Sequence, residues 1–349
     1  MNPVTTLNLS TDHQGIMAKL VSVIGAGGWG TALATVLGQK GLAVSLWCHG
    51  AQSYRELEDT KQNRSYLSGI VIPDTVNITR SLDEAVTDKE VVCCAVPSHA
   101  VRQVMSEASP YVHPKAIIIC GTKGLEEETS KTMGEVLLEI FGTAAAQRLA
   151  FISGPTFAIE VAQGLPAALT VAAYSQKIAA EIQALLSTAS LRAYTSKDVI
   201  GVQMGGVIKN VIAIAAGISD GLGLGHNARA ALITRGLAEM TRLAIRMGAE
   251  PLTLAGLPGV GDLLLTCTGA LSRNRQVGLQ IGAGKSLEEI SRGSRMVAEG
   301  IRNARSIYFL AQKLGVEMPI VEQMYRIIHE GKKPSEGVRD LMQRSLKAE

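Results

Sequence analysis

The segment from Leu20 to Ala34 constrains the fold of this 349-residue chain most strongly. It reads LVSVIGAGGWGTALA, so Gly25, Gly27 and Gly30 form a G-x-G-x-x-G pattern between an apolar, β-branched run and a helical pattern. In that context the glycines permit a tight turn, a close approach of a pyrophosphate, and close packing of helix on strand. The segment therefore predicts a dinucleotide-binding site. The alternative is an ordinary glycine-rich turn, since 36 glycines produce chance matches.

Short β-branched runs alternate with helical patterns as far as about residue 195, which predicts a mostly parallel sheet wrapped by helices. The expected strands are Leu20–Ile24, Ala43–Trp47, Glu90–Ala95, Ala116–Cys120, Leu149–Ile152, Ala168–Ala172 and Arg192–Tyr194. Beyond residue 198 long helical patterns dominate. We expect a disordered leader at 1–17, a Rossmann-type α/β domain at 18–197, and an all-helical substrate-binding and catalytic domain at 198–349.

The composition argues against several classes of function. A net charge of +3 is too small and too dispersed to indicate a nucleic acid or a membrane surface as partner. The first 15 residues lack the features of a signal peptide, and the apolar stretch Val199–Ile208 is too short to span a bilayer. Five cysteines without C-x-x-C spacing fit a reducing cytoplasm. No histidine spacing of the H-E-x-x-H kind is present, so we expect no metal.

Polar loops follow three of the expected strands, at Pro97–His99, Gly121–Gly124 and Ser153–Thr156. Ligands of open α/β sheets bind beyond the carboxyl ends of the strands, so these loops predict one cleft. Lys123 is the most informative of their residues, because a cation there can meet a phosphate or a carbonyl oxygen. The alternative is a solvated loop lysine.

Lys209 is the only charged residue in the stretch VIGVQMGGVIKNVIAIAAGIS between Asp198 and Asp220. A helix this apolar is buried on nearly all sides, and burial lowers the pKa of a lysine toward neutrality. Such a lysine can exchange a proton with a substrate oxygen at physiological pH. The alternatives are a lysine that reaches out of the core to solvent or one that pairs with a buried carboxylate.

Two further segments contain candidate residues. Asp262 stands alone between glycines and an apolar run, where it can cap a helix or orient Lys209. Ser272–Arg275 brings a hydroxyl, two guanidinium groups and an amide to a loop–helix junction, a set that suits a phosphate. The alternative for this segment is a solvated helix start. Glu299–Asn303 is another polar cluster, without an assigned role.

A series of motifs in order from about Lys19 to Gly331 resembles the bacterial NAD(P)-dependent glycerol-3-phosphate dehydrogenases. The motifs are GAGGWGTALA, VPSH, TKGLE, SGPTFA, GGVIKNVIAIAAGISDG, ALITRGLAEM, GVGDLLLTCTG, LSRNR and VAEGIRN. The resemblance implies reduction of dihydroxyacetone phosphate to sn-glycerol 3-phosphate, the backbone for phospholipid synthesis, and a homodimeric enzyme. Two departures are Cys48, where a glycine is common, and the additional leader.

The resemblance also implies roles for individual residues. Lys209 corresponds to the lysine that exchanges the proton, and Lys123 to a residue that touches both cofactor and substrate. Besides the three glycines, the implied cofactor contacts are Gly28, Trp29, His49, Ala158, Arg273, Val297 and Glu299. The implied substrate contacts, besides the two lysines, are Gly154, Thr156, Asp262, Ser272, Arg273 and Asn274.

The end of the second expected strand bears on the choice of cofactor. An acidic residue about 20 positions after the glycines would bind the ribose 2′-hydroxyl and repel a 2′-phosphate. The chain has Cys48, His49 and Gly50 there instead, with Arg55 a little further on. This predicts that NADP(H) is preferred and that NAD(H) is possible.

Two other functions are compatible with part of the pattern. A reductase of the same two-domain build that acts on a hydroxy acid or on ketopantoate shares the glycine loop and a helical lysine, but not the combination of SRNR with TKGLE. A non-catalytic protein that senses a nucleotide needs neither Lys209 nor Asp262. Oxidation of NADPH with and without dihydroxyacetone phosphate separates the three.

Overall fold

The structure is a computed structural model that describes residues 19–292, 298–346 and 348. The predicted leader and Val297 lie outside the described residues. Within them, eight strands form one sheet in the order β3-β2-β1-β4-β5-β6-β7-β8. The strands are β1 Leu20–Ile24, β2 Ala43–Trp47, β3 Val76–Thr79, β4 Val91–Cys94, β5 Ile117–Cys120, β6 Leu149–Ser153, β7 Ala167–Ala173 and β8 Leu191–Ser196.

The sheet confirms the predicted α/β fold with a mostly parallel sheet. All neighbouring strands run parallel except β6 and β7, which pair antiparallel. All seven expected strands are present, with ends that differ from the expectation by at most one or two residues. The sequence prediction missed β3, a four-residue edge strand whose short alternating pattern follows directly on a turn.

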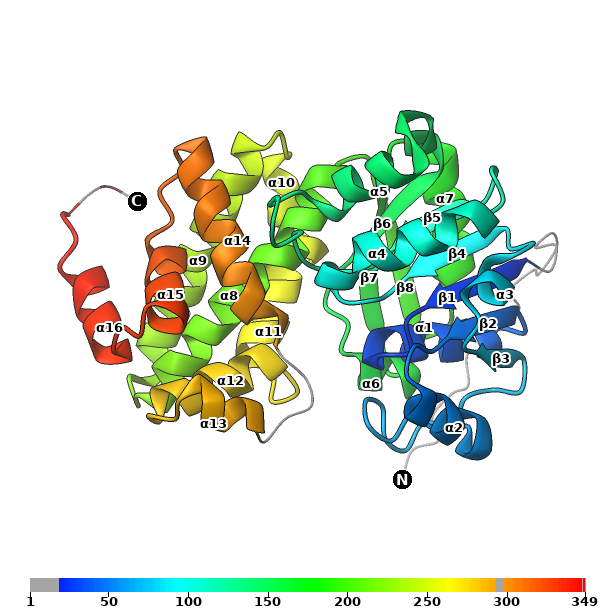
Figure 1. Cartoon of the computed structure of the whole chain (residues 1–349). Helices are drawn as coiled ribbons and strands as arrows, with labels where there is room; N and C mark the ends of the chain where they lie inside the picture. The colour runs from blue at the N-terminus through cyan, green and yellow to red at the C-terminus, as the bar shows by residue number, and fades with distance from the viewer. Residues whose placement is uncertain (1–18, 293–297, 347, 349) are drawn as a thin grey trace, which may run out of the picture.

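Helices cover both faces of the sheet (Figure 1). The core on one face includes α1 and α7, and the core on the other face includes α3, α4 and α5. The helices of this half are α1 Gly28–Gln39, α2 Ala51–Thr60, α3 Leu82–Val86, α4 Ser98–Ala108, α5 Met133–Phe141, α6 Ala158–Ala162 and α7 Gln176–Leu186, with the 3₁₀ turns η1 Ser109–Tyr111 and η2 Thr143–Arg148.

Figure 1 shows a second, helical half beside the sheet, with α8 at its centre. It consists of α8 Val199–Gly221, α9 Gly225–Arg246, α10 Pro251–Leu254, the π-helical turn η3 Leu257–Gly261, α11 Asp262–Thr268, α12 Arg273–Gly282, α13 Leu287–Arg292, α14 Glu299–Leu314, α15 Pro319–His329 and α16 Pro334–Met342. The change from strands to helices falls between Ser196 and Val199. Asp198 caps α8 by accepting a hydrogen bond from the Gly201 N–H at 2.8 Å.

The helix α8 is the single described helix that is long and apolar enough on its own to cross a membrane. The expectation that length excludes a span was therefore wrong, because the apolar pattern of Val199–Ile208 continues in the same helix to Gly221. Of its most apolar 18-residue window, 94% is buried inside the protein, where α8 is the centre of the helical core. Burial, rather than length, marks it as a core helix.

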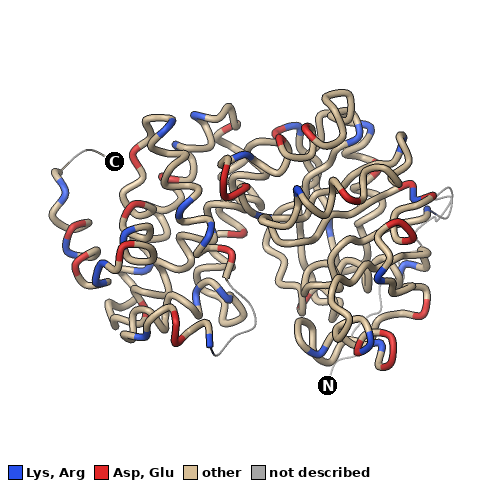
Figure 2. Tube along the Cα trace, viewed as in Figure 1, with Lys and Arg blue, Asp and Glu red and all other residues tan. Residues whose placement is uncertain are grey.

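Charged side chains of both signs are interspersed over the two halves (Figure 2). This dispersed arrangement agrees with the small net charge of +3. A small, dispersed charge does not point to a nucleic acid as partner. That this protein has no nucleic-acid partner stays a prediction.

Candidate active site

The glycine loop has the geometry that a dinucleotide site requires. Gly25 adopts a φ of +113°, a conformation that side chains disfavour, and its N–H donates to the Trp47 carbonyl at 3.2 Å. A Cβ at Gly30 would overlap the carbonyl oxygen of Gly25, whereas a Cβ at Gly27 would meet nothing within 4 Å. The first and third glycines are therefore needed for packing, and the second leaves open space beside the backbone.

The N-terminus of α1 fits the pyrophosphate of such a ligand. Its cap residue is Gly27, no side chain caps the helix, and no acidic residue stands in its first turn. The N–H groups of Gly28, Trp29 and Gly30 are thus left for an anion, and the helix dipole favours negative charge there. Ala158, the first residue of α6, packs near Gly28, as expected for two residues that contact one ligand.

Two of the three polar loops that the sequence placed at one cleft meet through Lys123. The Lys123 ammonium donates to the Gly154 carbonyl at 3.2 Å and to Oδ2 of Asp262 at 2.7 Å. Thr156 turns back and donates to the same Gly154 carbonyl at 3.1 Å. Lys123 is therefore a partly buried residue that joins the sheet half to the helical half, not a solvated loop lysine.

Lys209 and Asp262 form a buried ion pair beside Lys123. The Lys209 ammonium donates to Oδ1 of Asp262 and, at 2.9 Å, to the Thr266 hydroxyl. Lys209 is 7% exposed and Asp262 is 1% exposed. Asp262 is the first residue of α11 and makes no capping bond, because Gly261 is the cap residue. The carboxylate therefore orients two lysines and does not cap the helix.

Burial and the neighbouring charges set the ionisation of this pair. Burial lowers the pKa of Lys209 to about 8, with Asp262 opposing the change and the charge of Lys123 adding to it. Burial alone would raise the pKa of Asp262, but the two ammonium groups outweigh it and hold that pKa below its usual value. The site thus contains an ionised carboxylate and a lysine that titrates near physiological pH.

Sequence reasoning missed Thr266, which lies four residues after Asp262 and so on the same face of α11. It donates to the backbone carbonyl of Asp262 at 2.6 Å and accepts the hydrogen bond from Lys209. Thr266 could have been found from the sequence, because it lies one helical turn after Asp262, which was already a candidate residue.

Small residues bring α8 close enough to place Lys209 in the cleft. A Cβ at Gly205 would overlap the backbone of Pro258 in η3, the segment that leads to Asp262. A Cβ at Gly206 would lie 2.8 Å from the Ser153 hydroxyl and 3.2 Å from the Lys123 side chain. The two glycines before Lys209 therefore permit direct contact of the helix with both halves of the site.

The predicted phosphate segment begins α12. The Ser272 hydroxyl caps the helix by accepting from the Arg275 N–H at 3.2 Å, so part of its role is structural. Arg275 is held by Asp220, with its closest contact at 2.6 Å, and is not turned to a ligand. The Asn274 amide donates to Oδ1 of Asn210 at 2.9 Å and accepts from the Gly300 N–H at 3.0 Å.

Glu299 lies within the electrostatic influence of three predicted site cations. Burial raises the pKa of Glu299, while the charges of Arg273, Lys123 and Lys209 act in the opposite direction. Glu299 therefore lies close enough to Lys123, Lys209 and Arg273 for their positive charges to act on its carboxyl group. Val297 lies outside the described residues.

Two predicted cofactor residues lie at the edges of the glycine loop. The Trp29 indole packs over Gly121, and within the described part of the chain its buried Nε1 has no hydrogen-bond partner. His49 follows β2, with its ring 5.6 Å from that of Trp47. No three His, Cys, Asp or Glu side chains among the described residues gather as a metal site would require, and the absence of a metal stays a prediction.

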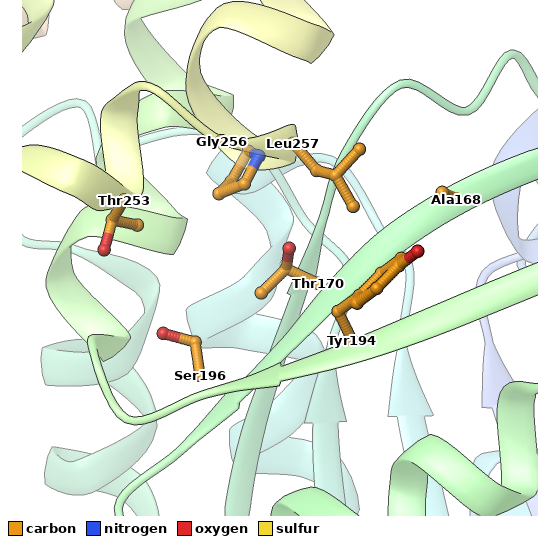
Figure 3. Close-up of a pocket in the computed structure, with 8 residues that line it drawn as sticks. Ala168, Thr170, Tyr194, Ser196, Thr253, Gly256 and Leu257 are labelled. Atoms are coloured by element: carbon orange, nitrogen blue, oxygen red, sulfur yellow. The ribbon is translucent and has the colours of Figure 1, made fainter.

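A separate pocket of about 410 Å³ lies between the end strands of the sheet and the α10–η3 segment (Figure 3). Thr170 and Ser196 come from the two strands and face the turn at Thr253 and Gly256. The pocket shares η3 with the cleft that holds Asp262, but no predicted site residue lines it. The residues singled out from the sequence belong to the cleft and not to this pocket.

A glycine loop suited to a dinucleotide at the switch point of a doubly wound sheet, together with a buried lysine of lowered pKa in the same protein, is typical of a nicotinamide-dependent dehydrogenase. Comparison with known proteins narrows this class. Family models described as the N-terminus and C-terminus of NAD-dependent glycerol-3-phosphate dehydrogenase match residues 20–179 and 198–339. The chain belongs to this family.

Named relatives support the assignment over nearly the whole chain. A glycerol-3-phosphate dehydrogenase (NAD(P)+) of Citrifermentans bemidjiense is 52% identical over 95% of this chain and 99% of its own length. One from Geobacter sulfurreducens is 48% identical over the same shares. The crystal structure of glycerol-3-phosphate dehydrogenase from Coxiella burnetii is 40% identical, with a TM-score of 0.90 over 93% of this chain and 99% of that one.

Proposed function

We propose that this protein reduces dihydroxyacetone phosphate to sn-glycerol 3-phosphate with NAD(P)H, reversibly, and that Lys209 is the catalytic residue. Family membership supports the reaction, and one observation carries the assignment of Lys209: a buried ammonium, held by Asp262 and Thr266, whose pKa is about 8. The product is a precursor of glycerophospholipids. Membership of the glycerol-3-phosphate dehydrogenase family does not support the two alternatives, a hydroxy-acid reductase and a nucleotide sensor.

The bound nicotinamide supplies the hydride for the substrate carbonyl. Lys209, protonated below pH 8, donates its proton to the alkoxide oxygen that develops at C2, and it accepts that proton in the reverse direction. Asp262 stabilises the protonated lysine and keeps its ammonium in one orientation. Lys123, bound to the other oxygen of Asp262, adds positive charge where the substrate oxygen becomes negative.

The substrate phosphate is assigned to the start of α12. Arg273 offers a guanidinium fork that matches phosphate oxygens, and Ser272 and Asn274 place a hydroxyl and an amide on either side of it. Gly154 and Thr156 are the proposed contacts from the sheet half. Binding at the phosphate, remote from the reacting carbon, fixes the carbonyl near Lys209.

Substitution of Lys209 tests the proposal directly. Lys209→Ala should lower turnover by about 100-fold or more, the typical contribution of general acid catalysis, while NADPH binding measured by fluorescence stays unchanged. Lys197→Ala, which removes an exposed lysine with a 74% exposed side chain, is the matched control. If Lys209→Ala kept turnover within a few-fold of the unaltered enzyme, the assignment would fail.

We also propose that NADP(H) is preferred over NAD(H), because the residues directly after β2 include no acidic side chain that would repel a 2′-phosphate. The values of kcat/KM for NADPH and NADH check this, and a tenfold preference for NADH would contradict it.

Four further expectations concern the context of the enzyme. Five cysteines, all reduced and buried, support a cytoplasmic location, which cell fractionation tests. The burial of α8 supports a protein that inserts into no membrane. A homodimer is expected, with light scattering as its measurement. The division into domains at 18–197 and 198–349 is supported by the change of structure after β8, and limited proteolysis at that junction tests it.

A further inference from the structure

We propose that Arg80 binds the 2′-phosphate of NADP(H) and determines the discrimination between the two cofactors. Arg80 directly follows β3, the strand that pairs with β2. The register places Trp47 opposite Thr79, and the Cys48 N–H donates to the Thr79 carbonyl at 2.9 Å. Arg80 is therefore the neighbour of Cys48, at the end of β2, where a doubly wound fold holds the adenosine ribose.

The backbone of Arg80 is fixed while its guanidinium is available. The Trp47 indole N–H donates to the Arg80 carbonyl at 3.1 Å. The Arg80 side chain is exposed, and no ion pair joins it to any other described residue. Glu84, an acidic neighbour, instead accepts from the Thr79 hydroxyl at 2.7 Å. An exposed guanidinium without an ion pair, on a backbone that is anchored, is a suitable anion-binding group.

The positive charge of Arg80 acts on the Cys48 thiol at the end of β2, and that of Arg55 does not. Burial raises the pKa of the Cys48 thiol, and the positive charge of Arg80 opposes the change. The same charge acts on the Tyr54 hydroxyl. Arg55, which the sequence suggested because it follows β2, is not among the groups that shift the pKa of Cys48. It lies on α2 as an exposed residue.

A guanidinium in this position suits a ribose 2′-phosphate. Arginine presents several N–H donors in a planar fork, and its bonds to phosphate are short, charge-assisted and frequently bidentate. NAD(H) has a hydroxyl at the same place and cannot make these bonds. The assignment rests on the proposed nicotinamide-dependent function and names the residue that sets its cofactor specificity.

Binding of 2′,5′-ADP and of 5′-AMP tests the assignment without turnover, since the two nucleotides differ only by the 2′-phosphate. By isothermal titration calorimetry, Arg80→Ala should weaken 2′,5′-ADP about 10- to 100-fold, the usual loss for a hydrogen-bonded charge. It should leave 5′-AMP unchanged. Arg80→Lys should recover part of the loss. Arg55→Ala, which removes an equal charge from the neighbouring helix, should affect neither nucleotide.

Three results would overturn the assignment. Equal weakening of both nucleotides by Arg80→Ala would indicate a contact with the adenine or ribose, not with the 2′-phosphate. No change would show that Arg80 binds neither. A loss in Arg55→Ala as large as that in Arg80→Ala would move the role to α2. The proposed preference for NADP(H) is tested separately. If the unaltered enzyme favours NADH while Arg80→Ala still weakens 2′,5′-ADP binding, the assignment of Arg80 stands and the preference for NADP(H) is refuted.

Discussion

Replacing Asp262 by Asn should move the pH dependence of the reaction, because Asp262 is the group that holds a proton on Lys209. In the folded enzyme the carboxylate accepts from Lys209 through one oxygen and from Lys123, at 2.7 Å, through the other. Asparagine keeps the shape and removes the negative charge. The repulsion between the two lysines then remains without a counter-charge, so the pKa of Lys209 falls below about 8.

The size of the effect follows from the ionisation of Lys209. Loss of an opposite charge at contact distance lowers the pKa of a neighbouring cation by roughly 1 to 3 units. At pH 7 about nine-tenths of Lys209 is protonated when its pKa is about 8, and only about one-tenth when the pKa is about 6. Turnover in the direction of reduction, which needs the protonated lysine, should therefore fall about tenfold at pH 7 from this cause alone.

Stopped-flow measurement of NADPH oxidation between pH 5.5 and 9.5 isolates the chemical step. For the unaltered enzyme the rate of reduction should decline above about pH 8 and the rate of the reverse oxidation should rise through the same range. In Asp262→Asn both transitions should move to lower pH. Asp220→Asn, which removes a carboxylate paired with Arg275 and Arg229, is the control and should keep the original profile. An unshifted profile in Asp262→Asn would refute the role given to Lys209.

Three further predictions concern binding and stability. Arg273→Ala should raise the KM for dihydroxyacetone phosphate about 10- to 100-fold and leave the weak reduction of dihydroxyacetone, which has no phosphate, unchanged in steady-state assays. A Cβ in Gly278→Ala would overlap the Ile214 carbonyl of α8, so urea unfolding should show a loss of at least about 1 to 3 kcal/mol. Burial raises the pKa of Glu239 to about 7 from 4.5, so the native state binds the extra proton and the free energy of unfolding falls as pH rises through that interval. Urea titrations of Glu239→Gln should lack that decline.

The sequence was sufficient for seven of the eight described strands of the sheet, because their signals are local. The apolar run that ends at Gly25 specifies a strand, a turn and a helix within 15 residues, and the structure has each where it was expected. The pairing of Lys209 with Asp262 was left as one of several possibilities, since 53 residues separate them. Which carboxylate meets a buried lysine depends on how α8 and α11 pack, and periodicity alone does not determine that.

The same limit explains why Lys123 was left undecided between a ligand-binding and a solvated lysine. Its position after β5 was correctly inferred, but its second partner, Asp262, comes from the other half of the molecule. The two lysines therefore converge on one carboxylate from opposite sides of the cleft. Any motion that separates the halves must break a buried charged contact, which is costly, so the pair also holds the cleft in the geometry that the reaction needs.

The missed strand and the proposed cofactor specificity are connected. Without β3, β2 has a neighbouring strand on one side only, β1, and the nearest cation after β2 in the sequence is Arg55. With β3 in place, Arg80 stands beside Cys48 even though 32 positions separate the two residues. Specificity for a 2′-phosphate in a doubly wound sheet can therefore come from the strand next to the one that ends at the ribose. An edge strand as short as β3 is not recognised from the sequence pattern. The residues after β2 therefore predict which cofactor can bind, but they do not identify the residue that distinguishes NADP(H) from NAD(H).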